Sequence, residues 1–289
     1  MCTSVETENM SVWINIAHTI IHSHCPSSFQ SHFGLSPQLC QLLWTKMSAT
    51  HLPPNLSVIH LLWVLYFLKT TPSSVFVLTA HLQIDNNTFF KWLPIVLDTI
   101  SQALPKVSSK FFVLNQEITF DERWVNWDAL SPSHVVDVTF IPITQPYLCS
   151  WEYWNSEYHK FGFKYQITCS LGGPKICSVH GPFKGSAADV SIYRQTIVPM
   201  LKVGEKGLGD SGYRHESNDH VIAAGSLDGI MVSKAYRVRQ NIERLIERMK
   251  NWGCLTVTWK YSWRLHKRCI EVIAQLANFI LEFQPLDSQ

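Results

Sequence analysis

The chain lacks several features that would place it in a specialised class. Its eight cysteines among 289 residues form no Cys-x-x-Cys pair and show no regular spacing, so neither a zinc framework nor a disulfide scaffold is indicated. Its longest apolar stretch, residues 56–68, is shorter than the about 20 residues that span a bilayer. The N-terminus shows no signal-peptide pattern. We therefore expect an intracellular protein with reduced thiols and no membrane segment.

Charge is scarce too, and it is unevenly distributed. The formal net charge is only +2, which by itself indicates no class of partner. Residues 1–120 carry five lysines, no arginine and five acidic residues, whereas residues 231–268 carry ten lysines and arginines against Glu243 and Glu247 alone. Basic character is therefore concentrated around Glu243.

The first part of the chain has helical patterns after a poorly patterned lead-in over residues 1–30. Ser36 and Pro37 suit the N-cap and the first position of a helix that ends near residue 47. Three further helices are predicted: over residues 57–69, over residues 71–82, and from the capping cluster at Asp85 to Leu104. Two helices joined by a short polar turn resemble a helix-turn-helix, although a plain helical bundle has the same pattern.

Beyond residue 125 the pattern changes to alternating strands and helices. The sequence predicts a domain boundary here, with a helical region over 1–125 and a second domain over 126–289. Three strands, a helix, one or two strands and two helices indicate a mixed α/β sheet covered by helices. Strands are predicted over 135–143, 163–171, 175–180, 206–210 and 221–224, and helices over 185–200, 234–250 and 260–282.

Two aspartates lie at or near predicted strand ends. Asp137 is in an apolar strand, where a carboxylate without a partner is costly to bury and a metal ion or a charged partner is expected. Asp210 follows a strand directly, a common place for ligand contacts in α/β sheets. Each also has an ordinary structural explanation: Asp137 as a polar strand-end residue, and Asp210 as a turn or N-cap residue.

A third acid, Glu243, is in the basic helical segment, one turn before Glu247 on the same helix face. Two strand-end aspartates and a helix-borne glutamate can converge on a pair of divalent metal ions, the arrangement used for phosphodiester chemistry. The neighbouring cations could contact phosphates or pair with these acids. Spacing alone does not choose between Glu243 and Glu247.

Five passages, taken together, resemble the DDE transposases of the PIF/Harbinger superfamily, including nucleases derived from them. They are similar to that family in order and spacing, and the resemblance extends over most of the chain from about residue 29. The passages are Asp137-Val-Thr139, the aromatic-rich run from Trp151 to Gln166, Gly181-Pro-Phe-Lys-Gly-Ser-Ala-Ala-Asp189, Gly209-Asp-Ser-Gly-Tyr213, and Arg239-Gln-Asn-Ile-Glu-Arg244 with Lys250.

The resemblance implies an RNase H-like mixed sheet flanked by helices and preceded by an all-α, helix-turn-helix-like N-terminal region. It also implies Asp137, Asp210 and Glu243 as the catalytic ligands of two Mg²⁺ or Mn²⁺ ions, and it favours Glu243 over Glu247. The implied reaction is hydrolysis of DNA phosphodiester bonds followed by strand transfer from the 3′-hydroxyl. Asp189 and Gly185 take supporting roles, and His159 in the aromatic-rich run is a further phosphate contact or a plain surface residue. Residues expected to contact DNA are Lys164, Arg239, Arg244, Arg248 and Lys250.

The implied partners are transposon ends and target DNA, a Myb-like DNA-binding protein and further copies of the chain, in the nucleus. Some positions depart from the family pattern: Val138 replaces a usual glycine, Ser211 a usual lysine, and Glu157 a common lysine. None removes a carboxylate. The alternatives are a domesticated, catalytically weak or inactive DNA-binding or scaffold protein, and a general RNase H-type nuclease.

Overall fold

The computed structural model describes residues 3–71, 74–107, 132–146, 150–171, 174–201, 205–213, 220–223 and 230–286. The chain divides into two compact units. The first is formed by residues 1–106 and 250–275, and the second by residues 107–249 and 276–289. The domain boundary predicted near residue 125 lies outside the described residues. Within them, no helix is long and apolar enough to cross a membrane.

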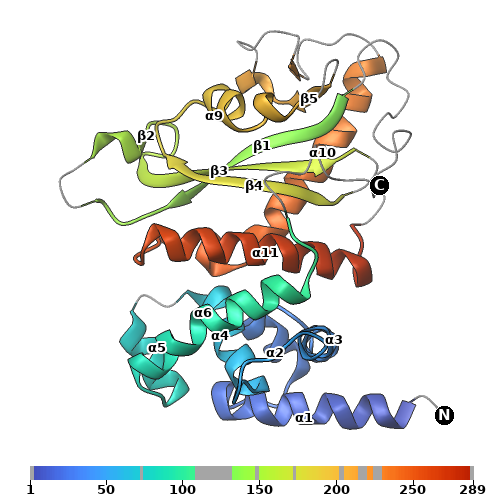
Figure 1. The fold of residues 1–289 in the computed structure, drawn as a ribbon, viewed down its shortest axis with the longest axis vertical. Helices are drawn as coiled ribbons and strands as arrows, with labels where there is room; N and C mark the ends of the chain where they lie inside the picture. Colours follow the sequence, from blue (N-terminus) through green and yellow to red (C-terminus); the bar gives the residue numbers. More distant parts are fainter. Residues whose placement is uncertain are drawn as a thin grey trace. The chain divides into compact units, whose positions relative to one another are not determined.

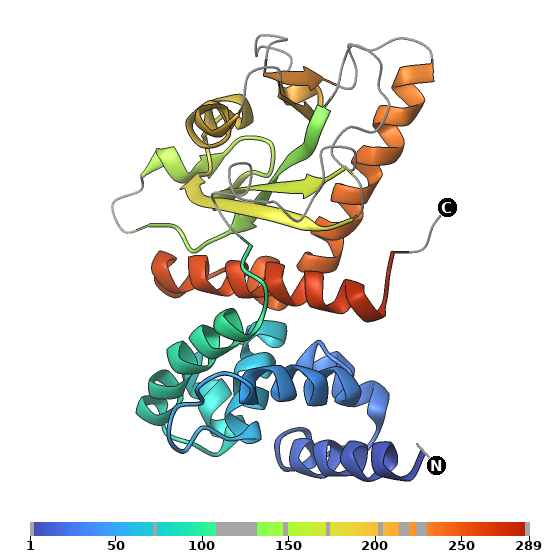
Figure 2. The ribbon, with the colours of Figure 1, turned by 45° about the vertical axis from the view of Figure 1, so that its right-hand side comes forward.

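The first unit is a bundle of helices (Figure 2). The predicted caps are present: Ser36 accepts a hydrogen bond from the backbone N–H of Leu39 at 3.3 Å, and Asp85 accepts one from Thr88 at 3.0 Å. These bonds satisfy N–H groups that a helix leaves unpaired at its start. The helices are α1 (Thr3–Ile21), α2 (Pro26–Phe33), α3 (Pro37–Ser48), α4 (Val58–Thr70), α5 (Val75–Leu82) and α6 (Asn86–Ala103).

Residues 1–30 are not an unpatterned lead-in, and this prediction was wrong. They contain α1 and the first part of α2. The apolar contacts of α1 come from Trp13, Ala17 and Ile20, which recur at helical spacing and are buried. Other apolar residues of α1, such as the exposed Val12, lie off this stripe, so the helix gives a weak amphipathic signal.

Residues 250–275 complete the helical unit, and no sequence pattern predicted their return to it. Gly34 has a left-handed backbone (φ +76°), and a Cβ there would lie 2.5 Å from the ring of Trp252. Lys69 donates a hydrogen bond to the carbonyl of Asn251 at 2.6 Å, and Gln275 donates one to the carbonyl of Leu104 at 3.2 Å. These contacts attach the segment to α2, α4 and the end of α6.

The second unit is built on a mixed sheet (Figure 1). Its strands follow the order β2-β3-β1-β5-β6, and β4 also pairs with β3. The pairs β1–β3 and β3–β4 are antiparallel, whereas β1–β5 and β5–β6 are parallel. The strands are β1 (Pro132–Pro142), β2 (Trp154–Asn155), β3 (Lys160–Ser170), β4 (Ile176–Lys184), β5 (Lys206–Gly209) and β6 (Val221–Ala223).

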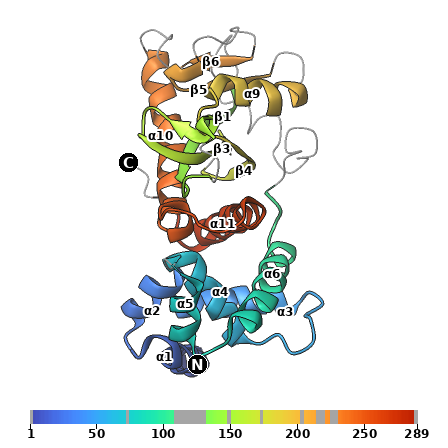
Figure 3. The same ribbon diagram turned by 90° about the vertical axis from the view of Figure 1, so that its left-hand side faces the viewer.

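Helices α9 (Asp189–Thr196) and α10 (Ile230–Lys250) lie on opposite sides of this sheet (Figure 3). The predicted mixed α/β sheet flanked by helices is confirmed, and it fits a DDE nuclease fold. A later helix, α11 (Trp263–Phe283), contributes residues to both units. In the second unit its Asn278 exchanges hydrogen bonds with the backbone of Ile176 at 2.9 and 2.8 Å.

Candidate active site

Asp137 and Asp210 lie next to each other on two parallel strands, Asp137 in the middle of β1 and Asp210 directly after the end of β5. The last parallel pair between β1 and β5 joins Val135 to Leu208. Each aspartate is two residues beyond this pair, and β5 ends at Gly209. Residues at equal offset from one pair of a parallel ladder lie side by side. The two strands therefore bring these carboxylates together. The expectation of a strand-end position is wrong for Asp137, because β1 continues to Pro142 and pairs with β3 on both sides of this residue.

Asp137 resists ionisation in this position. Burial raises the pKa of its carboxyl group to about 6, and the negative charges of Asp210 and Asp189 act in the same direction. The backbone N–H of Val138, which donates to Asp137 Oδ1 at 2.7 Å, and the guanidinium of Arg239 oppose this shift. The raised pKa therefore reflects chiefly the burial of this carboxyl group, with a smaller contribution from its acidic neighbours.

The turn after β5 holds Asp210. Its Oδ1 accepts a hydrogen bond from the backbone N–H of Gly212 at 2.9 Å, and its carbonyl accepts one from Tyr213 at 3.3 Å. A Cβ on Gly212 would lie 3.1 Å from Asp210 Oδ1 and 3.8 Å from Asp189 Oδ2. Both carboxylates thus lie close to this glycine, and a larger residue here would crowd them.

Asp189, the first residue of α9, is held by Lys164 of β3. The ammonium group of Lys164 lies 2.8 Å from Asp189 Oδ1 and also donates to the carbonyl of Ala187 at 2.9 Å. The Lys164 side chain is only 12% exposed, so it positions Asp189 and lies below the surface on which we expected it to meet DNA. Gly185 permits a close backbone approach, because a Cβ there would lie 2.3 Å from the carbonyl oxygen of Tyr153.

Glu243 lies on α10 and pairs with a cation. Arg239, one turn earlier, contacts Glu243 Oε1 at 3.0 Å while also acting on the pKa of Asp137. The Arg239 side chain is 17% exposed and that of Glu243 is 49% exposed. Among the described residues, no group of three or more histidines, cysteines, aspartates or glutamates is placed to hold a metal ion. The structure thus brings the two aspartates together, whereas Glu243 pairs with Arg239 and forms no three-carboxylate group with them among the described residues.

The other candidate DNA contacts have varied surroundings. Arg248 donates a hydrogen bond to the carbonyl of Gln284 at 2.6 Å. Arg244 is half-buried on α10, and Lys250, the last residue of that helix, belongs to the first compact unit. His159 is exposed and has a left-handed backbone (φ 49°).

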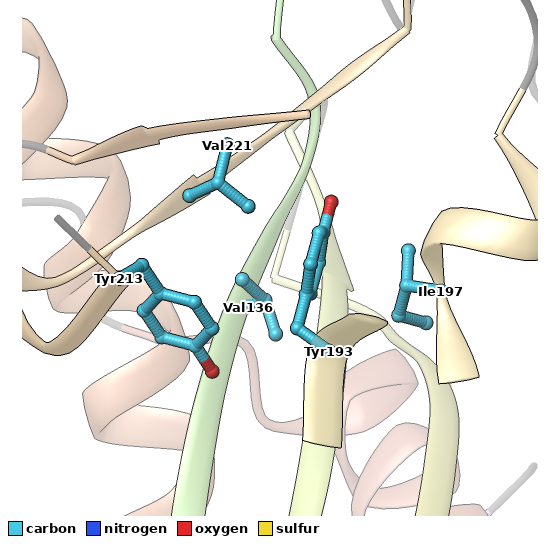
Figure 4. Close-up of a cluster of buried hydrophobic side chains, with 5 residues drawn as sticks. All are labelled: Val136, Tyr193, Ile197, Tyr213 and Val221. Atoms are coloured by element: carbon cyan, nitrogen blue, oxygen red, sulfur yellow. The ribbon is translucent and has the colours of Figure 1, made fainter. Parts of the chain in front are cut away.

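An apolar cluster supports the site from the α9 side of the sheet. It comprises Val136, Tyr193, Ile197, Tyr213 and Val221 (Figure 4). Because side chains alternate along a strand, Val136 faces this cluster and Asp137 faces the side of α10. The hydroxyls of Tyr193 and Tyr213 point in opposite directions. Rigid packing behind Asp137 keeps its position on the strand fixed.

The two tyrosines differ in how their hydroxyls are satisfied. The Tyr193 hydroxyl lies 3.1 Å from His134 Nε2 and donates to the carbonyl of His220 at 3.1 Å. Burial lowers the pKa of His134 to about 3, so this core histidine is neutral. The buried Tyr213 hydroxyl has no hydrogen-bond partner among the residues that the structure describes.

The nearby carboxylates also affect the pKa of Tyr213. Burial raises the pKa of its phenol, and the charges of Asp189, Asp137 and Asp210 raise it further. Sequence reasoning assigned Tyr213 no role, although it closes the motif that contains Asp210. Its adjacency to that aspartate was the one available signal.

Comparison with known proteins finds one matching family. Residues 136–278 match the family model described as DDE superfamily endonuclease. The matched segment contains Asp137, Asp210 and Glu243, and it supports a DDE-type, transposase-like family with nuclease activity that acts on DNA. No curated protein and no solved structure matches the chain.

Proposed function

We propose that the chain is a DDE-type nuclease of the PIF/Harbinger transposase superfamily, with an RNase H-like catalytic fold. The observation that carries this proposal is the placement of Asp137 of β1 beside Asp210, which follows β5, inside the segment that matches the endonuclease family. The sheet order, with three antiparallel strands followed by two parallel ones, supports the fold assignment.

DDE nucleases generally act with divalent metal ions, and the donor chemistry here suits Mg²⁺ or Mn²⁺. Both ions prefer carboxylate oxygens, and a bound cation would favour the ionised form of Asp137, whose pKa is raised by burial and by the charges of Asp210 and Asp189. We assign Asp137 and Asp210 as ligands, with Glu243 as a third once its carboxylate separates from Arg239. A bound pair of ions would activate water and stabilise charge on the reacting phosphate.

The protein's own groups would position the substrate. Arg239 can exchange Glu243 for a phosphate, because a guanidinium binds carboxylates and phosphates through the same two-pronged geometry. Strand cleavage at a transposon end, with later attack of the freed 3′-hydroxyl on target DNA, is the full reaction we propose. The DNA contacts would come from Arg244, Arg248 and Lys250. Further copies of the chain and a Myb-like DNA-binding protein would take part in the reaction, which we place in the nucleus.

Nicking of supercoiled plasmid in Mn²⁺ tests the assignment. The wild-type chain should nick, whereas Asp137→Ala and Asp210→Ala should lose activity by at least about a hundredfold, because each removes a ligand. Glu243→Gln and Glu247→Gln form a matched pair one turn apart on α10. Only the first should lose activity. Equal nicking by wild type and Asp137→Ala would refute the proposal.

The pairing of Glu243 with Arg239 favours a second candidate, a catalytically inactive DNA-binding or scaffold protein. In that case the ion pair is permanent and the aspartates do not bind metal. Thermal unfolding with increasing Mn²⁺ separates the two, because a ligand that binds only the folded state stabilises it. A nuclease should melt at higher temperature in Mn²⁺, and Asp137→Asn should abolish the increase. A scaffold should show no increase in either form.

A further inference from the structure

Lys164, which contacts Asp189 of the candidate active site, also lines a cavity. Its volume is about 450 Å³, within the range of small-molecule sites. The walls comprise Trp151, Trp154, Asn155, Ser156, Glu157, Lys164 and residues 185–188. Nothing in the proposed cleavage reaction uses it.

One wall of the cavity is an exposed but firmly held aromatic ring. Trp151 is 68% exposed, yet its ring lies edge-on against Trp154, with centroids 5.9 Å apart and an interplanar angle of 74°. The short helical turn Trp151–Tyr153 is attached to the rest of the unit by Ser186, whose backbone N–H and hydroxyl both donate to the carbonyl of Glu152, at 3.1 and 2.7 Å. A preorganised aromatic face of this kind is suited to stacking.

Small residues form another part of the cavity wall. Gly185, Ser186, Ala187 and Ala188 present little side-chain bulk. The Asn155 amide group donates to the carbonyl of Gly185 at 2.9 Å, and its oxygen accepts hydrogen bonds from two backbone N–H groups at 3.0 Å. An aromatic face together with small, internally bonded residues suits a planar ring.

The charges of the cavity favour a neutral ring over a phosphate. Lys164 is already neutralised by Asp189, and Glu157 adds a carboxylate to the lining. An anion would meet net negative charge there. A neutral base with an amino group can instead donate a hydrogen bond to Glu157, as cytosine does to acidic side chains.

We propose that this cavity receives one unstacked DNA base, stacked on Trp151 and read through its amino group by Glu157. The inference rests on the proposed action on DNA. Lys164 lines the cavity and contacts Asp189, so one side chain connects the cavity with this carboxylate of the candidate active site. A base held there would fix the position of the strand whose phosphate reaches Asp137 and Asp210.

Fluorescence anisotropy with labelled oligo(dC), oligo(dT) and a mixed-sequence duplex, at pH 8 in EDTA, tests the proposal on the full chain. Trp151→Ala should weaken binding of the single strands by about tenfold or more, the usual effect of removing a stacking ring. Trp263→Ala is the matched control, since Trp263 is also half-exposed but belongs to the other unit. It should change affinity less than twofold.

Glu157→Gln tests the reading of the base. Wild type should prefer oligo(dC) over oligo(dT), and the variant should lose that preference while keeping its fold by circular dichroism. Unchanged single-strand affinity in Trp151→Ala, or an equal loss on the duplex, would overturn the proposal. A chain that shows the Trp151 effect but never nicks plasmid would retain the base cavity and refute the nuclease.

Discussion

Asp137 and Asp210 are placed side by side by one backbone register, because each lies two residues beyond the parallel pair Val135–Leu208. The turn after β5 then holds the Asp210 carboxylate through the hydrogen bond from the Gly212 N–H. The register also explains the cost of the arrangement, since a buried carboxylate beside a second one ionises with difficulty.

The first prediction concerns pH and stability without metal. The pKa of Asp137 rises from 3.8 to about 6 on folding, so the folded state binds more protons than the unfolded state between these values. Stability should therefore fall as pH rises from about 4 to about 6. The shift corresponds to about 3 kcal/mol above pH 6.

Asp137→Asn removes this cost, because an amide carries no charge at any pH. In urea unfolding with EDTA at pH 8, the variant should be more stable than wild type by up to about 3 kcal/mol, with the difference vanishing near pH 4. Glu247→Gln replaces an exposed acid of α10 and should change neither the stability at pH 8 nor its dependence on pH. A variant less stable than wild type at pH 8 would show that Asp137 is not strained as described.

Local signals predicted much of this fold. The caps at Ser36 and Asp85 and the apolar runs of β1 and β3 use short-range rules of hydrogen bonding and alternation. The resemblance to the DDE family singled out the two aspartates, whereas the parallel pairing of β1 with β5 that brings them together was not predicted. Helix α1 was missed because apolar residues outside its buried stripe blur the helical periodicity.

Other features depend on contacts between distant residues. The place of Trp252 against Gly34 is set by shape, and no local pattern encodes it. The pairing of Arg239 with Glu243 is an ordinary one-turn contact, but the action of Arg239 on Asp137 requires knowing how α10 lies on the sheet. The cavity at Trp151 likewise combines three separate segments.

Arg239 should control the pH at which metal binds. Its charge lowers the pKa of Asp137, so Arg239→Gln should raise that pKa further above 6. Metal requires ionised carboxylates, and half-maximal Mn²⁺ stabilisation should move to higher pH in the variant. Arg248→Gln is the control, because Arg248 contacts the carbonyl of Gln284. An unchanged pH profile in Arg239→Gln would contradict the coupling.

Gly185 and Gly212 should differ sharply when replaced by alanine. A Cβ at Gly185 meets backbone oxygens at 2.3 and 2.8 Å, whereas one at Gly212 meets the carboxylate of Asp210 at 3.1 Å. Backbone cannot yield easily, so Gly185→Ala should destabilise the fold by about 1–3 kcal/mol. Gly212→Ala should have a free energy of unfolding within about 0.5 kcal/mol of the wild-type value, but it should bind Mn²⁺ more weakly. The comparison uses urea unfolding and Mn²⁺ titration, and equal stability losses would contradict it.

Tyr193 and Tyr213 offer the sharpest comparison in the core. Both are buried in the cluster behind Asp137, but only Tyr193 has partners for its hydroxyl, at His134 and the carbonyl of His220. Removing one partner of a buried hydrogen bond costs about 1–3 kcal/mol, whereas deleting an unpaired hydroxyl removes a desolvation cost. Tyr193→Phe should therefore lose stability in urea unfolding, and Tyr213→Phe should keep or gain it. If Tyr213→Phe were the more damaging change in EDTA, its hydroxyl would have to be bonded in the folded protein.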